Sequence, residues 1–397
     1  MPRSELPVFP FGHPQGPDIV PEYARLRREC PVPRVRLATG GEAFLITRHG
    51  DARRVYADPV FSRAACLAPE VPVLLAGSKI PGVMLNMDMP EHTRLRKLVV
   101  QAFTTGAVAR MRPRIEEIAT ELLDAMVAAG PPADFVSSFG VPFPARVICE
   151  ILGVPGEDVD RVVDWLRHIL SITRSTPEET ATAFRELTEY CAALIAEKRI
   201  HPAQDLITGL IQARDGGDRL SEQELVQLVW LHLGAGFETT ANMLPNAMLT
   251  LSRHPDQWAV LRDKPELVPT AVEELVRYVA VAQAGFERVA TTDVRLSGVP
   301  VPAGSVVLPV LNSVNFDADV FEEPERFDVT RTRNPHLGFG HGPHRCVGAP
   351  LGLMELEVAL LALLERMPGL HPSVPESELE WKRGMAVRAL VRLPVTW

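Results

Sequence analysis

The sequence predicts a mainly helical protein with one small β-rich portion. Three observations lead to this fold class. Helical hydrophobic patterns dominate from Pro90 onward, strand-like runs are short and few, and the chain contains no internal repeat, low-complexity tract or flexible linker. We therefore expect residues 1–397 to form a single continuous domain with a large helical body.

The first strands are expected near the N-terminus. A proline-rich opening precedes a short helix at residues 21–29, and strand-like runs then cover residues 34–37 and 43–47. Neighbouring short runs of this kind predict a small sheet.

A series of helical patterns follows and accounts for most of the chain. The expected ranges are 91–103, 107–129, 143–152, 159–172, 177–198 and 205–214. Between residues 294 and 310 the pattern alternates and is broken by turns, which predicts a hairpin with its bend at Pro302–Gly304. The last strands are expected within residues 386–395.

Composition argues against several classes of protein. The five cysteines are odd in number and widely spaced, which argues against a disulfide framework and predicts a reducing compartment, so we expect a cytoplasmic protein. No signal peptide is visible, and no apolar run reaches the roughly 18 residues that a membrane-spanning helix needs. The net charge of −9 and the lack of a basic tail argue against nucleic acid as a partner.

One long apolar helix is expected to cross the domain. Ser221 and Glu224 form a capping box at its start. Its middle carries glycines at 234 and 236 and the run Glu238–Thr240. Glycine costs a helix about 1 kcal/mol, and threonine competes for its backbone hydrogen bonds. We therefore expect a local opening of the helix at this point.

A single cysteine, Cys346, ends a glycine-rich loop that runs directly into another apolar helix. The glycines let the backbone turn sharply and lie close to a flat cofactor. Pro350 suits the first turn of a helix, which should therefore begin near Gly348. Cys346 would then lie at the positive end of this helix, where free amide groups favour an ionised sulfur that can bind a metal.

Two other interpretations of the loop stay open on these observations. An isolated cysteine is often an inert core residue. His341, His344 and Cys346 could also bind zinc, although a zinc site would leave the glycines, Phe339 and the following helix unexplained.

The loop closely resembles the haem-binding loop of the cytochrome P450 family, whose pattern is Phe-Gly-x-Gly-x-His-x-Cys-x-Gly. The residues that fill its six fixed positions are Phe339, Gly340, Gly342, His344, Cys346 and Gly348. The resemblance extends over essentially the whole chain. It implies the cytochrome P450 fold, with haem b as the cofactor and Cys346 as the ligand of the haem iron.

The middle of the long helix resembles the oxygen-binding groove of the same family. By this resemblance Thr239 would hydrogen-bond dioxygen and Glu238 would help to relay protons from solvent. Ala235 and Gly236 would leave room for the gas molecule. Splitting dioxygen requires such a supply of protons, while a thiolate ligand supplies electron density from the opposite side.

Three departures from the residues usual in the family have no assigned role at this stage. Phe237 stands where histidine is frequent, Pro245 lies inside the long helix and should kink it, and Phe316 stands where arginine is frequent. None of the three replaces the acid or the alcohol.

The resemblance also gives roles to two sets of charged residues. The cationic partners of the two haem propionates would be His92, Arg96, Arg288 and His344. A buried charge network around the cysteine loop would consist of Glu274, Arg277 and Arg326.

The implied activity is that of a monooxygenase. It would insert one oxygen atom of O2 into an apolar small molecule during secondary-metabolite biosynthesis, where the substrates include polyketides, macrolides, terpenoids and cyclic peptides. The chain has no dinucleotide fingerprint and no cysteine cluster for an iron–sulfur centre, so its electrons would come from NAD(P)H through a ferredoxin and its reductase. These partners are expected to approach Arg94, Arg110, Arg112 and Arg345.

Other activities remain compatible with the sequence. Within the enzymes they are oxidative coupling of carbon–carbon or carbon–nitrogen bonds and a peroxide-driven oxidase. A protein of another class would bind haem only to sense or carry a ligand. In every case the resemblance implies an apolar pocket, lined by residues 66–85, 164–193, 280–286 and 385–387, His232 and Ala235.

Overall fold

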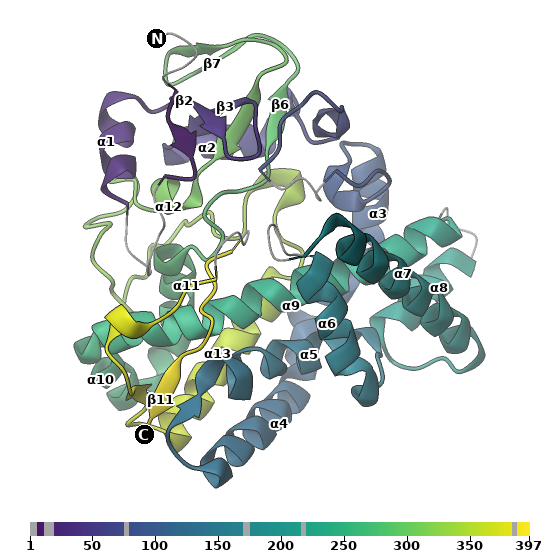
Figure 1. Cartoon of the computed structure of the whole chain (residues 1–397), viewed down its shortest axis with the longest axis vertical. Helices are drawn as coiled ribbons and strands as arrows, with labels where there is room; N and C mark the ends of the chain where they lie inside the picture. Colours follow the sequence, from purple (N-terminus) through teal and green to yellow (C-terminus); the bar gives the residue numbers. More distant parts are fainter. Residues whose placement is uncertain (1–5, 12–19, 75–78, 170–174, 216–219, 383–386) are drawn as a thin grey trace.

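The computed structural model consists of a large helical body and a smaller β-rich part that contains the N-terminal strands (Figure 1). It describes residues 6–11, 20–74, 79–169, 175–215, 220–382 and 387–397. This arrangement confirms the predicted fold class. Among the described residues no helix has the length and apolar character needed to cross a membrane.

Six helices of the body agree with their predicted ranges to within a few residues. They are α3 (Glu91–Val100), α4 (Thr105–Ala129), α5 (Pro142–Leu152), α6 (Val159–Ile169), α7 (Pro177–Ile200) and α8 (Leu206–Asp215). The long expected helix is α9 (Glu222–Arg253), and the body also contains α10 (Pro255–Asp263), α11 (Val268–Val279) and α13 (Ala349–Arg366). Residue 172, the predicted end of the fourth of the expected helices, lies outside the described residues.

The β-rich part is built on a six-stranded sheet with the order β1-β2-β3-β9-β6-β4. Its strands are β1 (Val8–Phe9), β2 (Arg34–Leu37), β3 (Glu42–Ile46), β4 (Phe61–Ser62), β6 (Arg288–Ala290) and β9 (Val306–Pro309). The predicted helix α1 (Pro21–Glu29) is present, and α2 (His49–Ala57) and the short α12 (Leu311–Val314) lie beside it. Parallel pairing of β3 with β9 joins segments that are far apart in the sequence.

The predicted hairpin exists, but its predicted bend is wrong. The paired strands are β7 (Val294–Leu296) and β8 (Val299–Val301), and the loop between them is Ser297–Gly298. Both loop residues have positive φ, 44° and 80°, and two-residue loops of this kind match the twist of the flanking strands. The turn at Pro302–Gly304 instead leads from β8 into β9.

At the other end of the chain a three-stranded sheet has the order β10-β11-β5. These strands are β10 (His371–Pro372), β11 (Pro394–Thr396) and β5 (Ala133–Asp134). Of the expected range 386–395, the C-terminal end forms part of β11, isolated bridges involve Val387 and Leu390, and residue 386 lies outside the described residues.

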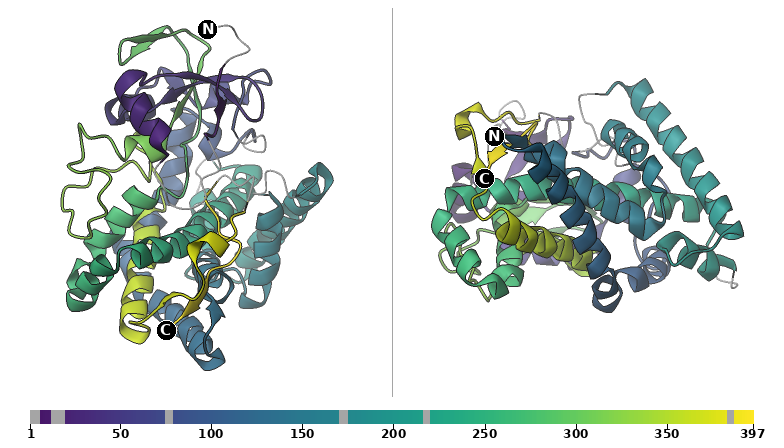
Figure 2. Two further views of the ribbon diagram at one scale, coloured as in Figure 1. Left: turned by 60° about the vertical axis from the view of Figure 1, so that its left-hand side comes forward. Right: turned by 90° about the horizontal axis from the view of Figure 1, so that it is seen from below.

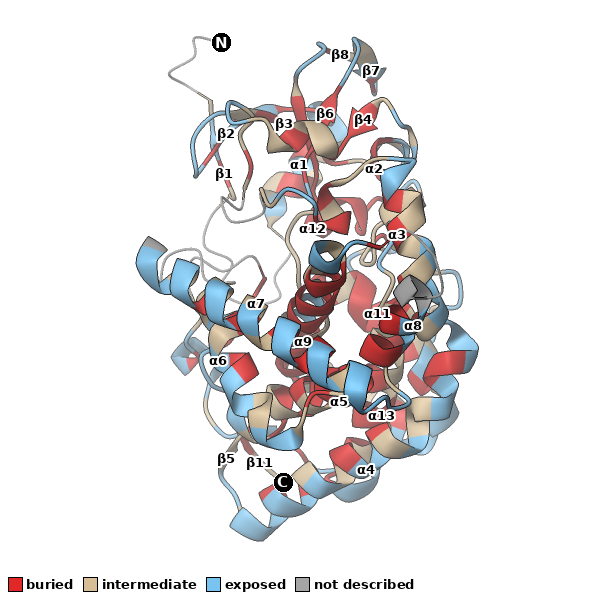
Figure 3. Ribbon diagram, turned by 90° about the vertical axis from the view of Figure 1, so that its right-hand side faces the viewer, coloured by how far each residue is buried: buried red, intermediate tan, exposed pale blue. Residues whose placement is uncertain are grey.

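Helix α9 crosses the centre of the molecule and is buried along most of its length (Figure 3). The predicted capping box is present, because Ser221 Oγ accepts from the amide of Glu224 and the Glu224 carboxylate accepts from the amide of Ser221. The expected local opening is absent, since the helix is continuous from Glu222 to Arg253. Thr239 Oγ1 and Asn242 Nδ2 donate to the carbonyl oxygens of residues 235 and 238, so these side chains reinforce the helix.

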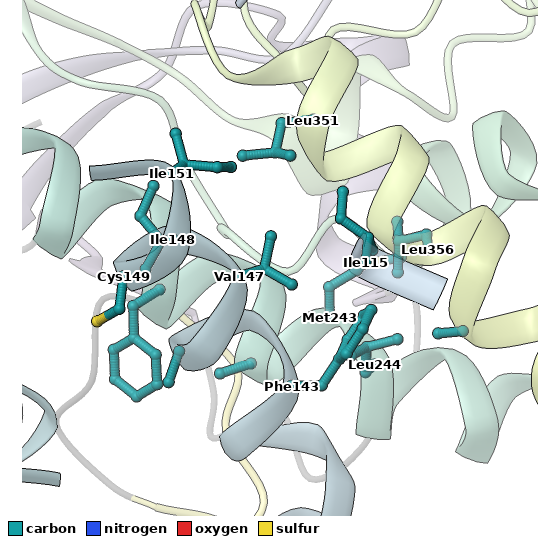
Figure 4. Close-up of a cluster of buried hydrophobic side chains, with 14 of the residues drawn as sticks. Ile115, Phe143, Val147, Ile148, Cys149, Ile151, Met243, Leu244, Leu351 and Leu356 are labelled. Atoms are coloured by element: carbon teal, nitrogen blue, oxygen red, sulfur yellow. The ribbon is translucent and has the colours of Figure 1, made fainter. Parts of the chain in front are cut away.

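Side chains from four helices form the core around α9. Figure 4 shows Ile115 of α4, Phe143 and Val147 of α5, Met243 of α9 and Leu356 of α13 in one cluster. Helices α4 and α13 also run side by side (Figure 2). This packing explains how the start of α13, which follows the cysteine loop, is fixed relative to the middle of α9.

Two of the unassigned aromatic and proline residues have packing roles. Phe237 is only 1% exposed and belongs to the core cluster. Pro245 lies against Gly140 at the end of a π-helical turn, Val136–Gly140, and a methyl group on Gly140 would approach Pro245 Cγ to 2.9 Å. Neither residue therefore needs a catalytic role to explain its presence.

A buried ion pair on α11 stabilises the segment that leads to the cysteine loop. Glu274 and Arg277 have fully buried side chains, and their closest charged atoms are 2.7 Å apart. Arg277 also donates to the carbonyl oxygens of Asn315, Pro324 and Arg326. Its guanidinium carbon lies 5.2 Å from the centre of the Phe316 ring, which gives Phe316 a cation–π role.

The prediction that the side chain of Arg326 is the third member of this network is wrong. Its side chain is 60% exposed and pairs with Glu323, and only its backbone carbonyl takes part. The third side chain is that of Arg331, whose Nε lies 3.2 Å from Glu274. The sequence did not indicate Arg331 because its position depends on a turn. The chain turns between Arg326 and Arg331, where the amide of Arg331 donates to the carbonyl of Asp328, and this turn brings Arg331 to α11.

The corrected network predicts different effects for the two arginines. Arg331→Leu should lower the free energy of unfolding by about 3 kcal/mol, because it leaves the buried Glu274 with one cation fewer. Arg326→Ala should leave the unfolding midpoint unchanged, because that side chain is in solvent. Urea unfolding of both variants tests this, and equal losses would contradict the assignment of Arg331.

Candidate active site

The cysteine loop is a tight turn held by its own backbone. The amide of Gly340 donates to the carbonyl of Leu337, and the amide of Cys346 donates to the carbonyl of Phe339, each at 2.8 Å. Gly340 and Gly342 have φ values of 68° and 70°, which side chains other than glycine rarely adopt. Helix α13 begins directly afterwards with Gly348 as its N-cap, which confirms the predicted helix start.

The loop is also packed against the β-rich part of the molecule. A methyl group on Gly342 would lie 2.6 Å from the carbonyl oxygen of Tyr56, at the end of α2. Gly342 is therefore required for close approach as well as for its backbone conformation.

Cys346 is an exposed residue, although many protein atoms surround its thiol. Burial raises the pKa of the thiol, whereas the amides of Gly348 and Ala349 and the charges of Arg96 and Arg345 oppose that rise. A cation bound at the sulfur would favour the thiolate further.

Two histidines and two arginines gather beside this loop. The rings of His92 and His344 lie 4.0 Å apart, and Arg96 Nη2 donates to the carbonyl of Arg345 at 2.6 Å. The fourth is Arg288, which is buried, lies 5.4 Å from the centre of the Tyr56 ring and has an Nε atom without a hydrogen-bond partner among the described residues.

The electrostatics of this cluster favour an anionic ligand. Burial, reinforced by the neighbouring cations, lowers the pKa of His92 to about 4 and that of His344 to about 2. For Arg288 the pKa also falls, to about 10, mainly through burial. A pair of carboxylates placed here would compensate the charges of Arg96 and Arg288 and satisfy the free Nε of Arg288.

The zinc interpretation of His341, His344 and Cys346 is wrong. Within the described ranges no group of three or more histidine, cysteine or acidic side chains is placed to hold a metal ion. The ring of His344 instead contacts the ring of His92, tilted by 34°.

The middle of α9 has one side that is not fully covered. Ala235 and Thr239, four residues apart and therefore on the same side of the helix, are exposed although most of α9 is buried. Neighbouring side chains therefore cover this side of the helix less than the rest. This is the helix face that the sequence assigns to oxygen chemistry.

Gly236 lies against α5. A methyl group on Gly236 would lie 2.7 Å from Ile148 Cδ1, so the glycine permits close packing of the two helices. Successive residues of a helix point about 100° apart, so Ala235 faces another direction.

Glu238 is held by a residue that sequence reasoning missed. Asn242 Nδ2 donates to the Glu238 backbone oxygen at 2.7 Å and to its Oε1 at 2.9 Å. Burial raises the pKa of Glu238, whereas Lys382, Asn242 and Arg167 oppose that rise. The signal in the sequence was the four-residue spacing of Glu238 and Asn242, which places both on one helix face.

Two of the residues expected to line a substrate pocket, Phe286 and His232, have contacts that define their surroundings. Phe286 is 42% exposed, and its ring lies 5.2 Å from the guanidinium carbon of Arg63. His232 is buried, stacked on Phe103 and hydrogen-bonded through Nδ1 to the Leu228 carbonyl, so it serves packing.

Several of the pocket residues expected from the sequence lie outside the described residues. They are residues 75–78, 170–174 and 385–386.

Comparisons with known proteins agree with this fold and site. The family model described as Cytochrome P450 matches residues 150–387. The chain is 45% identical to nocardicin C N-oxygenase of Nocardia uniformis subsp. tsuyamanensis, and 44% identical to mycinamicin IV hydroxylase/epoxidase of Micromonospora griseorubida. Both alignments cover 100% of each chain.

A solved structure of the putative thioether synthase SgvP, from the tailoring step of griseoviridin, superimposes with a TM-score of 0.94. It is 40% identical to this chain, and the match covers 99% of this chain and 100% of that one.

The chain belongs to the cytochrome P450 family, and it is a monooxygenase of the bacterial secondary-metabolite type. Haem is the cofactor of this family, and the described residues fit it. An exposed cysteine, a cluster of histidines and arginines with an unpartnered buried nitrogen and an exposed helix face with a hydroxyl would supply an iron ligand, propionate partners and a distal face respectively.

One further buried acid lies between the two helices of the site. Glu355 of α13 is 1% exposed, and burial raises its pKa to about 8. Neither of its carboxyl oxygens meets hydrogen-bond geometry with a described atom, although the Thr240 hydroxyl is close enough to offset part of the rise. The carboxyl is therefore protonated at neutral pH.

This acid predicts a pH-dependent stability. The native state keeps a proton on Glu355 up to a pH of about 8, whereas the unfolded chain releases it near pH 4.5. The contribution of Glu355 to the free energy of unfolding is therefore fully present below pH 4.5 and is lost as the pH rises toward 8. The slope contributed is at most about 1.4 kcal/mol per pH unit. Thermal unfolding at pH 5 and pH 8 should show a smaller difference for Glu355→Gln than for the parent protein; an unchanged difference would contradict this role.

Proposed function

We propose that this enzyme inserts one oxygen atom of O2 into an apolar secondary metabolite, with Cys346 as the ligand of the haem iron. The observation that carries the proposal is the exposed Cys346 at the N-terminus of α13, next to a cluster of histidines and arginines that has an unpartnered nitrogen. Two relatives are named for reactions on such metabolites. One is nocardicin C N-oxygenase, and the other is mycinamicin IV hydroxylase/epoxidase.

Each part of the loop would contribute to holding haem b. Phe339, Gly340 and Gly348 shape the turn that presents Cys346, since the Phe339 carbonyl accepts from the Cys346 amide. His92, Arg96, Arg288 and His344 would bind the propionates. We propose that residues 1–397 act as one cytochrome P450 domain, because the aligned relatives cover the chain completely.

Haem supplies the activation of dioxygen when electrons reach it from outside. The contribution of this chain on the α9 side is a hydroxyl and an acid. Thr239 exposes its hydroxyl on the same face as Ala235, and Glu238, held by Asn242, lies near the charges of Lys382 and Arg167. We propose that Glu238 exchanges protons with solvent and that the Thr239 hydroxyl would hold a proton on the Ala235 side of α9.

We propose a ferredoxin and its NAD(P)H-dependent reductase as the electron donors. Of the arginines expected to face them, Arg94 and Arg112 are partly neutralised by Glu224 and by Glu357 and Glu116. Arg345, adjacent to Cys346, is exposed and is the better placed contact for an acidic partner. The five free cysteines support a cytoplasmic location, where such donors are found.

Oxidative coupling is a second candidate because SgvP, with a TM-score of 0.94, is named as a putative thioether synthase. A peroxide-driven oxidase would not need the arrangement of Glu238, Asn242 and Thr239, and a haem protein that only senses a ligand would not turn over NADPH. Titration of candidate metabolites against the haem absorption band, followed by product analysis with ferredoxin, distinguishes these possibilities.

Replacement of the cysteine tests iron ligation. Cys346→Ala should abolish the thiolate-type carbon monoxide spectrum of the reduced protein, because no other described cysteine lies in the loop. Cys30→Ala, which changes an exposed cysteine far along the chain, is the matched control and should keep the normal spectrum. A normal spectrum in the Cys346 variant would rule out this ligand.

Replacement of the threonine tests proton delivery. Thr239→Ala should lower the product formed per NADPH by roughly tenfold or more and divert the electrons to hydrogen peroxide, because the donor hydroxyl is lost. Thr239→Ser keeps a hydroxyl at the same place and should retain most of the coupling. Equal coupling in the alanine variant and the parent enzyme would remove Thr239 from the mechanism.

A further inference from the structure

The segment that precedes the cysteine loop runs along α11 and contacts it at three successive points. Asn334 Nδ2 donates to Glu274 at 3.1 Å, and His336 Nε2 lies 2.6 Å from Glu273 Oε2. At Gly338 an added methyl group would come within 2.5 Å of Val276 Cγ1. The middle contact, between His336 and Glu273, is separate from the Glu274–Arg277 ion pair.

The imidazole of His336 makes two hydrogen bonds that fix its tautomer. Its Nδ1 accepts from the amide of Gly338 at 3.1 Å, and an amide can only donate, so Nδ1 carries no hydrogen. The hydrogen therefore resides on Nε2, which donates to Glu273. The His336 side chain is only 5% exposed, whereas that of Glu273 is 42% exposed.

The Gly338 amide is close in sequence to a hydrogen bond of the cysteine. It lies two peptide units before the carbonyl of Phe339, which accepts from the amide of Cys346 at 2.8 Å. The His336 ring also lies 5.9 Å from the Phe339 ring. A change in the orientation of the 338–339 peptides would therefore alter the hydrogen bond at the cysteine itself.

The segment has other anchors, so His336 is not needed to hold it in place as a whole. The amide of Leu337 donates to Asn315 Oδ1 at 2.8 Å, and His49 Nε2 contacts the Pro335 carbonyl at 2.9 Å. What His336 adds is the direction of the Gly338 amide.

We propose that His336 is a positioning residue for the haem ligand. Supported by Glu273, it sets the geometry of the Phe339–Cys346 hydrogen bond and thereby the electron-donating strength of the sulfur. Hydrogen bonds and orientation around a metal ligand are known to tune affinity and reduction potential. The inference rests on the proposed ligation of iron by Cys346.

Two substitutions separate the halves of this interaction. In His336→Asn the side-chain oxygen can still accept from the amide two residues ahead, but it cannot reach Glu273. In His336→Gln the longer side chain can reach Glu273 but is poorly placed for the Gly338 amide. His336→Ala removes both contacts, and His371→Ala, at an exposed histidine, is the control.

The measurements are the reduction potential of the purified haem-loaded proteins and the share of their reduced carbon monoxide complex that shows the thiolate-type band. His336→Ala and His336→Gln should shift the potential and lower that share by about twofold or more, whereas His336→Asn and the control should stay close to the parent protein. Glu273→Ala, made at a half-exposed position of α11, removes the acceptor that keeps the His336 hydrogen on Nε2. The hydrogen can then move to Nδ1, which ends acceptance from the Gly338 amide, so this variant should shift both readouts in the same direction as His336→Ala even where that variant folds poorly.

The outcomes separate the inference from the proposal beneath it. A parent protein without the thiolate-type band would refute ligation by Cys346. If the parent shows the band while His336→Ala and Glu273→Ala both match it in band and potential, the ligation proposal stands and the positioning role of His336 is overturned. Loss in His336→Asn with retention in His336→Gln would likewise overturn the assignment to the Gly338 amide.

Discussion

The structure around the active site depends on how charged side chains of α11 satisfy a long stretch of irregular backbone. Between α12 and α13 the chain forms no long helix or strand, so its amide and carbonyl groups need partners from elsewhere. Arg277 donates to three of its carbonyl oxygens, and Arg331 donates to those of Glu322, Glu323 and Arg326. Glu274 compensates both guanidinium groups.

The buried ion pair is therefore better understood as a support for backbone than as a source of net stability. Burial of two charges is costly in itself, and the gain in direct attraction is largely offset by desolvation. Its value here is that a segment without regular secondary structure can still have one defined path. That path ends at Cys346, and contacts between residues 334–338 and α11 extend the same support to the edge of the loop.

The two sides of the site have opposite electrical character. Near Cys346 the charged groups are arginines, and burial, reinforced by these cations, lowers the pKa values of His92 and His344. On α9 the buried acid is Glu238, whose pKa is raised by burial and partly restored by Lys382, Asn242 and Arg167. An anionic cofactor near Cys346 and the role proposed for Glu238 call for these different surroundings.

The sequence by itself determined the class of this protein. Three local features carried this information: the capping box of α9, the helical periods, and the spacing of Phe339, Gly340, Gly342, His344, Cys346 and Gly348. Local features of this kind can be recognised in a sequence before the fold is known. Tertiary structure alone decided which distant groups meet. It replaced Arg326 by Arg331 in the network, turned Gly236 toward Ile148, and joined His92 to His344 and His336 to Glu273. These contacts depend on the paths of the loops that connect the helices. Packing and hydrogen bonds between segments far apart in the sequence determine those paths.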